Sequence, residues 1–175
     1  RNILLQLLDS LDIPIIVTGG KSTIDQQVAA EIPALKNVHS LIGRISLEEC
    51  AALTDMSLAF VGVDTFNCHL AAAFNKPIFV IFGPNNPEAW SPWSNALQRA
   101  GQRTAPVQTY GDITVFQSSL ECVPCGHSAR CGDRDRLSAC MADIEPRTVF
   151  NEIKNWLSKS LPESRENAKA TILPA

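Results

Sequence analysis

The sequence has no excess of positive charge and no long apolar run. It contains 15 Lys and Arg residues against 18 Asp and Glu residues, a formal net charge of −3 over 175 residues. Proteins that follow a nucleic-acid backbone carry a basic surface, so nucleic acid is not an expected partner. No apolar run approaches the ~20 residues that span a bilayer, and no basic segment leads into an apolar one as in a secretory signal. We therefore expect a cytoplasmic chain without a transmembrane segment.

An initiating methionine is also missing. The chain opens at Arg1 and passes directly into NILLQLLDSL, in which the apolar residues recur at helical spacing. This opening is typical of a chain from which an earlier element has been cut away. We therefore expect a fragment or a processed half of a longer protein.

Cysteine is not scarce, but the six cysteines do not indicate a secreted disulfide scaffold. With 45% hydrophobic residues, a chain of this length can bury one domain-sized core. A core of that size together with the lack of an export signal favours a reducing compartment. The thiols are therefore expected as ligands or as core residues, and Cys50 is expected in the core.

Short apolar runs alternate with helical patterns along the chain. Strands are predicted near residues 13–17, 57–61 and 77–82, and further short strands in the stretches VHSLIG and ITVFQ. The run at 77–82 is almost wholly apolar, as in strands that helices cover on both faces. The alternation predicts an α/β fold with a parallel, doubly wound sheet of about five strands.

Capping patterns mark the starts of the predicted helices. Ser22 is followed by Asp25, and Ser46 by Glu49, each pair at the spacing of a capping box. Pro146 stands at a favoured first-turn position of a last amphipathic helix. These signals place helices directly after the predicted strands and their loops.

The stretch GVDTFNCHL lies where an apolar strand gives way to a helix. In doubly wound sheets ligands bind beyond the carboxyl ends of the strands, where helix N-termini attract anions. Thr65 and the amides of Phe66 and Asn67 would meet a phosphate, while Asp64 is an acceptor suited to sugar hydroxyls. From these residues alone a structural interpretation is favoured, in which Asp64 or Thr65 caps the helix and His69 packs in its first turn.

Four motifs in a fixed order point further. They are TGG, SLIGRISLEECAAL, VGVDTFNCHLAAAFNKPIFVIFGPNNPEAWSPW and CVPCGHSARCGDRDRLSACMADIEPRTV. Together they resemble the C-terminal half of glycosyltransferase family 9, the heptosyltransferases of lipopolysaccharide synthesis. That family carries an Asp-Thr-Gly-x-x-His-Leu-Ala-Ala-Ala turn, a Phe-Gly-Pro-x-x-Pro loop and a late Cys-x-x-Cys region. The resemblance covers about residues 13–157.

The resemblance implies a two-domain GT-B enzyme, of which this chain would be the Rossmann-like C-terminal domain. Residues 1–161 would form the nucleotide-sugar-binding domain, including a Cys-rich loop at 120–141, and residues 162–175 a polar tail. The N-terminal acceptor domain, which carries the general-base carboxylate, would be absent. No catalytic residue is therefore assigned to this chain.

The resemblance also implies roles for individual residues. Asp64 would bind donor sugar hydroxyls, and Thr65 and His69 with nearby amides would hold the diphosphate. Relatives have glycine where Phe66 stands, so a side chain crowds the backbone approach to phosphate, and its ring would stack on the donor or face away. Relatives often place a carboxylate in the first turn of the helix after TGG, where Ser22 and Thr23 stand here and Asp25 lies further on. The expected donor site comprises Gly20, Arg44, Ile45, Asp64, Thr65, Phe66, Asn67 and His69, with Arg44 and Ile45 bordering the nucleobase.

The expected function is inverting transfer of heptose from ADP-heptose to the lipopolysaccharide core. Helix amides and side-chain cations can stabilise the leaving diphosphate, so no cofactor is expected for catalysis. The acceptor would bind through the missing half, in the cytoplasm or at the periphery of the inner membrane, and this chain alone would bind donor without catalysing. Two alternatives stay open: a protein heptosyltransferase that acts on autotransporters, and a degenerate module for assembly in which Phe66 blocks the phosphate site.

Four cysteines, Cys122, Cys125, Cys131 and Cys140, form the pattern C-x2-C-x5-C-x8-C. Such a set could make a tetrahedral thiolate site for a structural zinc or iron ion that braces the loop, with His127 as a spare ligand. The spacing is irregular, and loop cysteines of this kind are also found free or linked in disulfides. In each case we expect the four to converge in space.

The remaining candidates have two interpretations each. Trp90 and Trp93 either line the donor cleft or seal the edge of the core, and an aromatic pair on a long loop more often does the latter. Cys68 is expected to be buried in its helix. Because a helix N-terminus can lower a thiol pKa, a reactive nucleophile is the alternative for Cys68.

Overall fold

The computed structural model describes residues 1–102, 105–126, 131 and 138–160. The predicted polar tail at 162–175 and the spare ligand His127 lie outside these residues. Helices and strands alternate through the described part of the chain. No helix in that part is long and apolar enough to cross a membrane.

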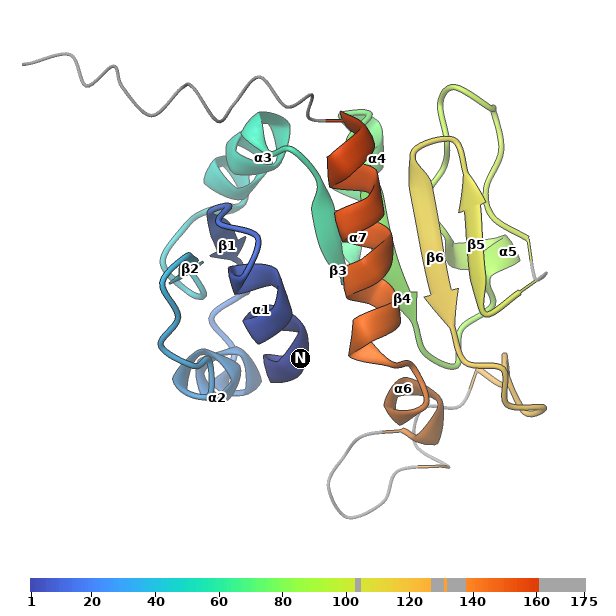
Figure 1. Ribbon diagram of the computed structural model, residues 1–175, viewed down its shortest axis with the longest axis horizontal. Helices are drawn as coiled ribbons and strands as arrows, with labels where there is room; N and C mark the ends of the chain where they lie inside the picture. Colours follow the sequence, from blue (N-terminus) through green and yellow to red (C-terminus); the bar gives the residue numbers. More distant parts are fainter. Residues whose placement is uncertain (103–104, 127–130, 132–137, 161–175) are drawn as a thin grey trace, which may run out of the picture.

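The strands form two separate sheets (Figure 1). The smaller sheet pairs two short parallel strands, and the larger has the order β3-β4-β6-β5, with all pairs parallel except β5 with β6. The strands are β1 (Ile15–Val17), β2 (Val38–Ser40), β3 (Phe60–Val63), β4 (Ile78–Phe82), β5 (Val107–Tyr110) and β6 (Ile113–Gln117).

Parallel pairing dominates, which confirms the α/β class, but the arrangement differs in detail from one five-stranded parallel sheet. The edge strand β5 was not predicted, because its sequence is short and only partly apolar. It joins β6 through Gly111 and Asp112, a connection of a length that only antiparallel strands allow. Gly111 has a φ of +54°, which glycine adopts without strain. The strand predicted at 57–61 begins at Phe60, because Ser57 still belongs to the end of the preceding helix.

Helices cover both faces of the larger sheet. On one face α4 (Phe66–Ala73) lies against β3 and β4, and its alanines let the helix approach the strands closely. On the other face α7 (Pro146–Ser160) covers the sheet and runs roughly along its strands, with α1 (Asn2–Asp9) packed beside it (Figure 1). This two-sided cover is the reason why β4 is apolar throughout.

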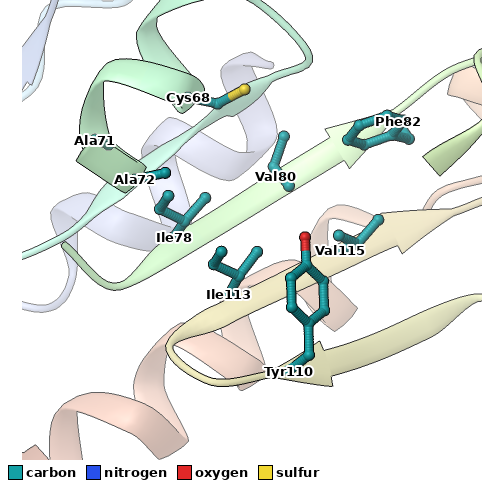
Figure 2. Close-up of a cluster of buried hydrophobic side chains, with 9 residues drawn as sticks. All are labelled: Cys68, Ala71, Ala72, Ile78, Val80, Phe82, Tyr110, Ile113 and Val115. Carbon is teal, nitrogen blue, oxygen red and sulfur yellow. The ribbon is translucent and has the colours of Figure 1, made fainter. Parts of the chain in front are cut away.

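The side chains of β4 alternate between the two core clusters. Ile78, Val80 and Phe82 belong to the cluster under α4, which Figure 2 shows together with Cys68 and Tyr110. Phe79 belongs to the cluster under α7, where its ring lies edge-on to that of Trp156 with centroids 5.8 Å apart. β4 therefore anchors both halves of the core.

Two of the remaining helices begin as the sequence predicts, and two short helices lie in stretches predicted as loops. Capping boxes open α2 (Thr23–Ala30) and α3 (Leu47–Met56), with the side chains of Ser22 and Ser46 accepting from the third helical N–H. Two single-turn helices, α5 (Pro87–Trp90) and α6 (Ala139–Ala142), flank the loops at the carboxyl ends of the strands. Cys50, expected in the core, is only half-buried, because no residue of α3 is fully covered by its neighbours.

The central role of β4 leads to a stability prediction. Phe82 is completely buried, so Phe82→Ala should lower the free energy of unfolding by about 3–5 kcal/mol through lost burial and the cavity left behind. Urea denaturation followed by circular dichroism would measure it. Leu58→Ala is the control, because Leu58 is 45% exposed and should cost far less. Equal losses in the two variants would contradict this assignment of the core.

Candidate functional site

The turn between β3 and α4 lies at the carboxyl edge of the larger sheet. The N–H of Asp64 donates to the carbonyl of Ile81 at 3.3 Å, so the ladder between β3 and β4 continues to Asp64. Thr65 is extended, with φ −146° and ψ 171°, and the helix begins at Phe66. A carboxylate, a hydroxyl and a helix N-terminus therefore meet in one turn.

No side chain caps the N-terminus of α4. Thr65 Oγ1 donates to the carbonyl of Val63 at 3.3 Å instead of accepting from the helix. The carbonyl of Thr65 accepts from both the N–H and the thiol of Cys68, at 3.1 and 2.9 Å. Within the described part of the chain, the N–H groups of Phe66 and Asn67 have no acceptor. Two donors at the positive end of the helix dipole are thus available to an anion.

The carboxylate of Asp64 is oriented by its neighbours. Its side chain is only 12% exposed, and Oδ2 accepts a hydrogen bond from Asn85 Nδ2 at 2.8 Å. The other oxygen, Oδ1, lies 4.0 Å from Nε2 of His69, whose side chain is 45% exposed. In the structural interpretation of the motif, Asp64 or Thr65 would cap the helix and His69 would be packed in its first turn. Instead, the carboxylate of Asp64 accepts a hydrogen bond from Asn85 and does not cap the helix, and the side chain of His69 is exposed.

Two residues that hold this arrangement were not assigned from the sequence. Asn85 lies in the loop after β4, and Gln117 ends β6. The buried Gln117 donates through Nε2 to the carbonyl of Gly83 at 3.1 Å and to that of Asn85 at 2.8 Å. The Phe-Gly-Pro-x-x-Pro motif marks the loop of Asn85 in the sequence. That Gln117 holds this loop follows only from the parallel pairing of β4 with β6.

One group of metal-ligand side chains in the described residues has all its ligand atoms within 4.8 Å of one another: Asp64, Cys68 and His69. Cys68 is completely buried, as expected. Burial raises the pKa of its thiol, and the charge of Asp64 raises it further against the hydrogen bond to Thr65. A protonated, buried thiol is a poor metal ligand and a poor nucleophile. This chemistry favours a binding turn over a metal centre or a reactive cysteine.

The other predicted donor residues form a second group at the ends of β1 and β2. The N–H of Gly43 donates to the carbonyl of Gly19 at 3.1 Å, which places Gly20 beside the loop that carries Arg44 and Ile45. A Cβ at Gly43 would lie 2.5 Å from Gln26 Nε2, and its φ is +70°, so the position requires glycine. Arg44 is exposed and Ile45 half-buried.

A contact between helices connects the two groups. The helix α3 follows the loop with Arg44 and Ile45, and its Cys50 donates through Sγ to Oδ1 of Asn67 at 3.9 Å. Asn67 belongs to the first turn of α4. The structure therefore brings Asp64, Thr65, Phe66, Asn67 and His69 into one turn, and Gly20, Arg44 and Ile45 into a neighbouring pair of loops.

The large aromatic side chains around these loops remain exposed. Phe66 is 59% exposed, so its ring is not packed into the core. Trp90 and Trp93 are 60% and 49% exposed and do not seal the edge of the core. The adjacent Pro87 and Pro92 are fully buried.

All six cysteines are described and are in the thiol form. Cys122 and Cys131 are exposed, and Cys140 is buried. Partial desolvation raises the pKa of the Cys131 thiol, and the thiols of Cys122, Cys125 and Cys140 raise it further, together with a side-chain hydrogen bond to Cys122. In the described residues these four thiols do not form a group whose sulfur atoms all lie within 4.8 Å of one another, so their convergence on one metal ion stays a prediction.

Comparison with known proteins gives one family and two relatives. The family described as glycosyltransferase family 9 (heptosyltransferase) matches residues 3–114. Lipopolysaccharide heptosyltransferase 3 from Escherichia coli is 34% identical over 86 residues, which are 47% of this chain and 25% of that protein. Lipopolysaccharide heptosyltransferase 3 from Escherichia coli strain K12 is 30% identical over 158 residues, 89% of this chain and 40% of that protein. No solved structure gives a significant match.

The chain thus spans 25% to 40% of the length of the curated relatives that it matches. The family match covers more than half of the chain and includes both loop groups of the candidate site. It agrees with the order of motifs and with the α/β fold of mainly parallel strands. This chain belongs to glycosyltransferase family 9, the heptosyltransferase family.

Proposed function

We propose that this chain is the donor-binding half of an inverting heptosyltransferase and that the turn from Asp64 to His69 binds the nucleotide sugar. The observation that carries the proposal is the uncapped N-terminus of α4, where the N–H groups of Phe66 and Asn67 have no acceptor in the described structure. A diphosphate supplies the negative charge and the acceptor oxygens that such a helix end favours.

The neighbouring side chains would each contact a different part of the donor. Asp64 is held by Asn85 with an oxygen turned toward His69, so it can accept from sugar hydroxyls beside the diphosphate. His69 is exposed and can donate to a phosphate oxygen. Arg44 and Ile45 would border the nucleobase, with Gly20 close to them. ADP-heptose agrees with the family and supplies the sugar hydroxyls, diphosphate and nucleobase that these contacts require.

In this proposal, the groups that carry out the transfer belong to another part of the enzyme. A general base must deprotonate the acceptor hydroxyl while the diphosphate leaves from the opposite face of the sugar, which inverts the configuration. We place that base and the lipopolysaccharide core acceptor on the remainder of the full-length protein. The chain alone would therefore bind the donor without transferring the sugar, and the helix amides would stabilise the leaving diphosphate without a divalent ion.

One departure from the family pattern favours a second candidate function. Phe66 stands where relatives have glycine, and a side chain at this position can crowd the approach of a phosphate. A degenerate, non-catalytic module for assembly would result if that crowding prevents binding. A protein acceptor, as in autotransporter glycosylation, would use the same donor turn and would differ only in the missing half.

The role of Asp64 gives a prediction for sugar recognition. Asp64→Ala should weaken the binding of ADP-heptose by about 1.5–3 kcal/mol, an increase in Kd of roughly ten- to a hundredfold, because a charged hydrogen-bond partner is lost. The binding of ADP should weaken much less, because ADP lacks the hydroxyls of the donor heptose. Titration calorimetry with both ligands would measure this. Asp55→Ala, which removes an exposed carboxylate from α3, should leave both affinities unchanged.

Three results are informative beyond the expected one. Equal weakening of ADP and ADP-heptose in Asp64→Ala would leave Asp64 a purely structural role. Failure of the wild-type chain, shown to be folded by circular dichroism, to bind either ligand would support the degenerate module. Recovery of binding in Phe66→Gly would then identify the phenylalanine as the cause.

The hydrogen bond from Asn85 gives a prediction about orientation. Asn85→Asp should weaken the sugar donor more than Asn85→Ala does, because it replaces the amide donor by a second carboxylate next to Asp64. Asn86→Asp is the matched control: it adds the same charge one residue away, where aspartate also caps α5. Calorimetry with ADP-heptose would compare the three variants. Equal effects of Asn85→Asp and Asn86→Asp would show that only the added charge matters.

A further inference from the structure

The loop after β4 is held through its backbone carbonyls. Those of Gly83 and Asn85 accept hydrogen bonds from Nε2 of Gln117 at 3.1 and 2.8 Å. Between them, the carbonyl of Pro84 accepts from the N–H of Gly126 at 2.9 Å. Three consecutive residues of the loop are therefore bonded to groups that lie far from it in the sequence, and two of these bonds come from one side chain.

The side chain of Gln117 is itself well fixed. Gln117 lies opposite Phe82 in the last register pair of β4 with β6, directly before the loop begins. Its backbone N–H donates to the carbonyl of Pro106 at 2.8 Å, and the residue is only 7% exposed. Burial of an amide costs free energy unless its N–H groups are bonded, and here Nε2 gives its bonds to the loop. Gln117 is therefore a rigid point on the sheet from which the loop is positioned.

The packing of the sheet does not explain an amide at this position. Every residue of β6 is buried, so a side chain without polar atoms would fill the place of Gln117 at less cost. Methionine is unbranched and adapts to such a space. It would, however, leave the carbonyls of Gly83 and Asn85 without this donor. The amide of Gln117 therefore serves the loop.

Asn85 depends on this support more than a buried residue would. It is exposed, so packing contributes little to the place of its side chain. Its Nδ2 nevertheless donates to Oδ2 of Asp64 at 2.8 Å. Water competes for hydrogen bonds at an exposed position, so this bond depends on how well the backbone of Asn85 is placed. That placement includes the bond from Gln117 to the carbonyl of Asn85.

We propose that Gln117 is a positioning residue of the donor site: by fixing the backbone of Asn85, its side-chain amide sets the orientation of the Asp64 carboxylate. Asn85 then holds one oxygen of Asp64, and the other oxygen stays turned toward His69, 4.0 Å from Nε2. Asp64 thus takes its orientation from β6, which lies two strands away from β3 in the sheet. Only the consequence for donor affinity rests on the function proposed above.

Side-chain amide resonances test the positioning without any ligand. In the ¹⁵N-labelled chain, the side-chain NH₂ signal of Asn85 should shift when Asp64→Ala removes its acceptor, and Gln117→Met should shift it in the same direction. Gln108→Met is the matched control, because Gln108 lies on β5 and its side chain accepts from the N–H of Gln102. It should leave the signal unchanged. An unchanged Asn85 signal in folded Gln117→Met would overturn the proposal, because a role in stability alone predicts that result.

Two further measurements apply if circular dichroism shows that Gln117→Met does not fold. Gln117→Asn keeps the amide but is shorter by one methylene, so it should shift the Asn85 signal in the same direction. In the wild-type chain, the side-chain N–H groups of Gln117 should exchange with solvent more slowly than those of Gln108, because the former are buried and bonded to two carbonyls. Equal exchange at the two glutamines would overturn the proposal.

Titration calorimetry with ADP-heptose tests the consequence for the donor. Gln117→Met should raise the Kd about two- to tenfold, the effect of one neutral hydrogen bond. In the Asn85→Ala background the same change should have no further effect, because the residue through which Gln117 acts is gone. Equal effects in both backgrounds would overturn the action through Asn85. If the Asn85 signal responds as expected but the wild-type chain does not bind ADP-heptose, the proposed donor function fails while the positioning of Asp64 stands.

Discussion

The parallel pairing of β3 with β4 and of β4 with β6 is the constraint on which the candidate site at Asp64–His69 depends. It brings the carboxyl ends of three strands to one edge of the sheet. Asp64 then follows β3, the loop with Asn85 follows β4, and Gln117 ends β6. The strand register sets the spacing of these residues. It thereby brings Asn85 within hydrogen-bonding distance of Asp64, and Gln117 within hydrogen-bonding distance of the carbonyl of Asn85. The buried alternation of β4 in turn holds this register against slipping by one residue.

Local sequence signals predicted much of this structure. Capping boxes at Ser22 and Ser46, the start of the last helix at Pro146 and the strand ITVFQ are all found where the sequence indicates. Such features depend on residues within a few positions of one another. Pairing between distant strands does not, so the separation of β1 and β2 from the larger sheet and the antiparallel β5 were not predicted. The same reason explains why Asn85 and Gln117 were not assigned to the site from the sequence. Their hydrogen-bond partners are 21 residues and 32 or more residues away, respectively.

Family membership and local geometry support different parts of the account. Membership of family 9 gives the class of enzyme, and the relatives named lipopolysaccharide heptosyltransferase 3 are much longer than this chain. The geometry contributes what the family match lacks: an uncapped helix end, a carboxylate oriented by Asn85 and an exposed His69. The exposed ring of Phe66 lies on the same turn. The features on which the proposed donor recognition rests therefore lie within a few residues of the start of α4.

The central claim is that the first N–H groups of α4 receive a diphosphate. A titration of the ¹⁵N-labelled chain with ADP, followed through its amide resonances, tests this directly. The account predicts that the largest shifts occur at Phe66 and Asn67, the two amides without an acceptor in the described structure. Smaller shifts should follow at His69 and in the loop around Arg44. Saturable binding with shifts confined to other surfaces, such as the loop of Trp90 and Trp93, and none at the start of α4 would contradict it.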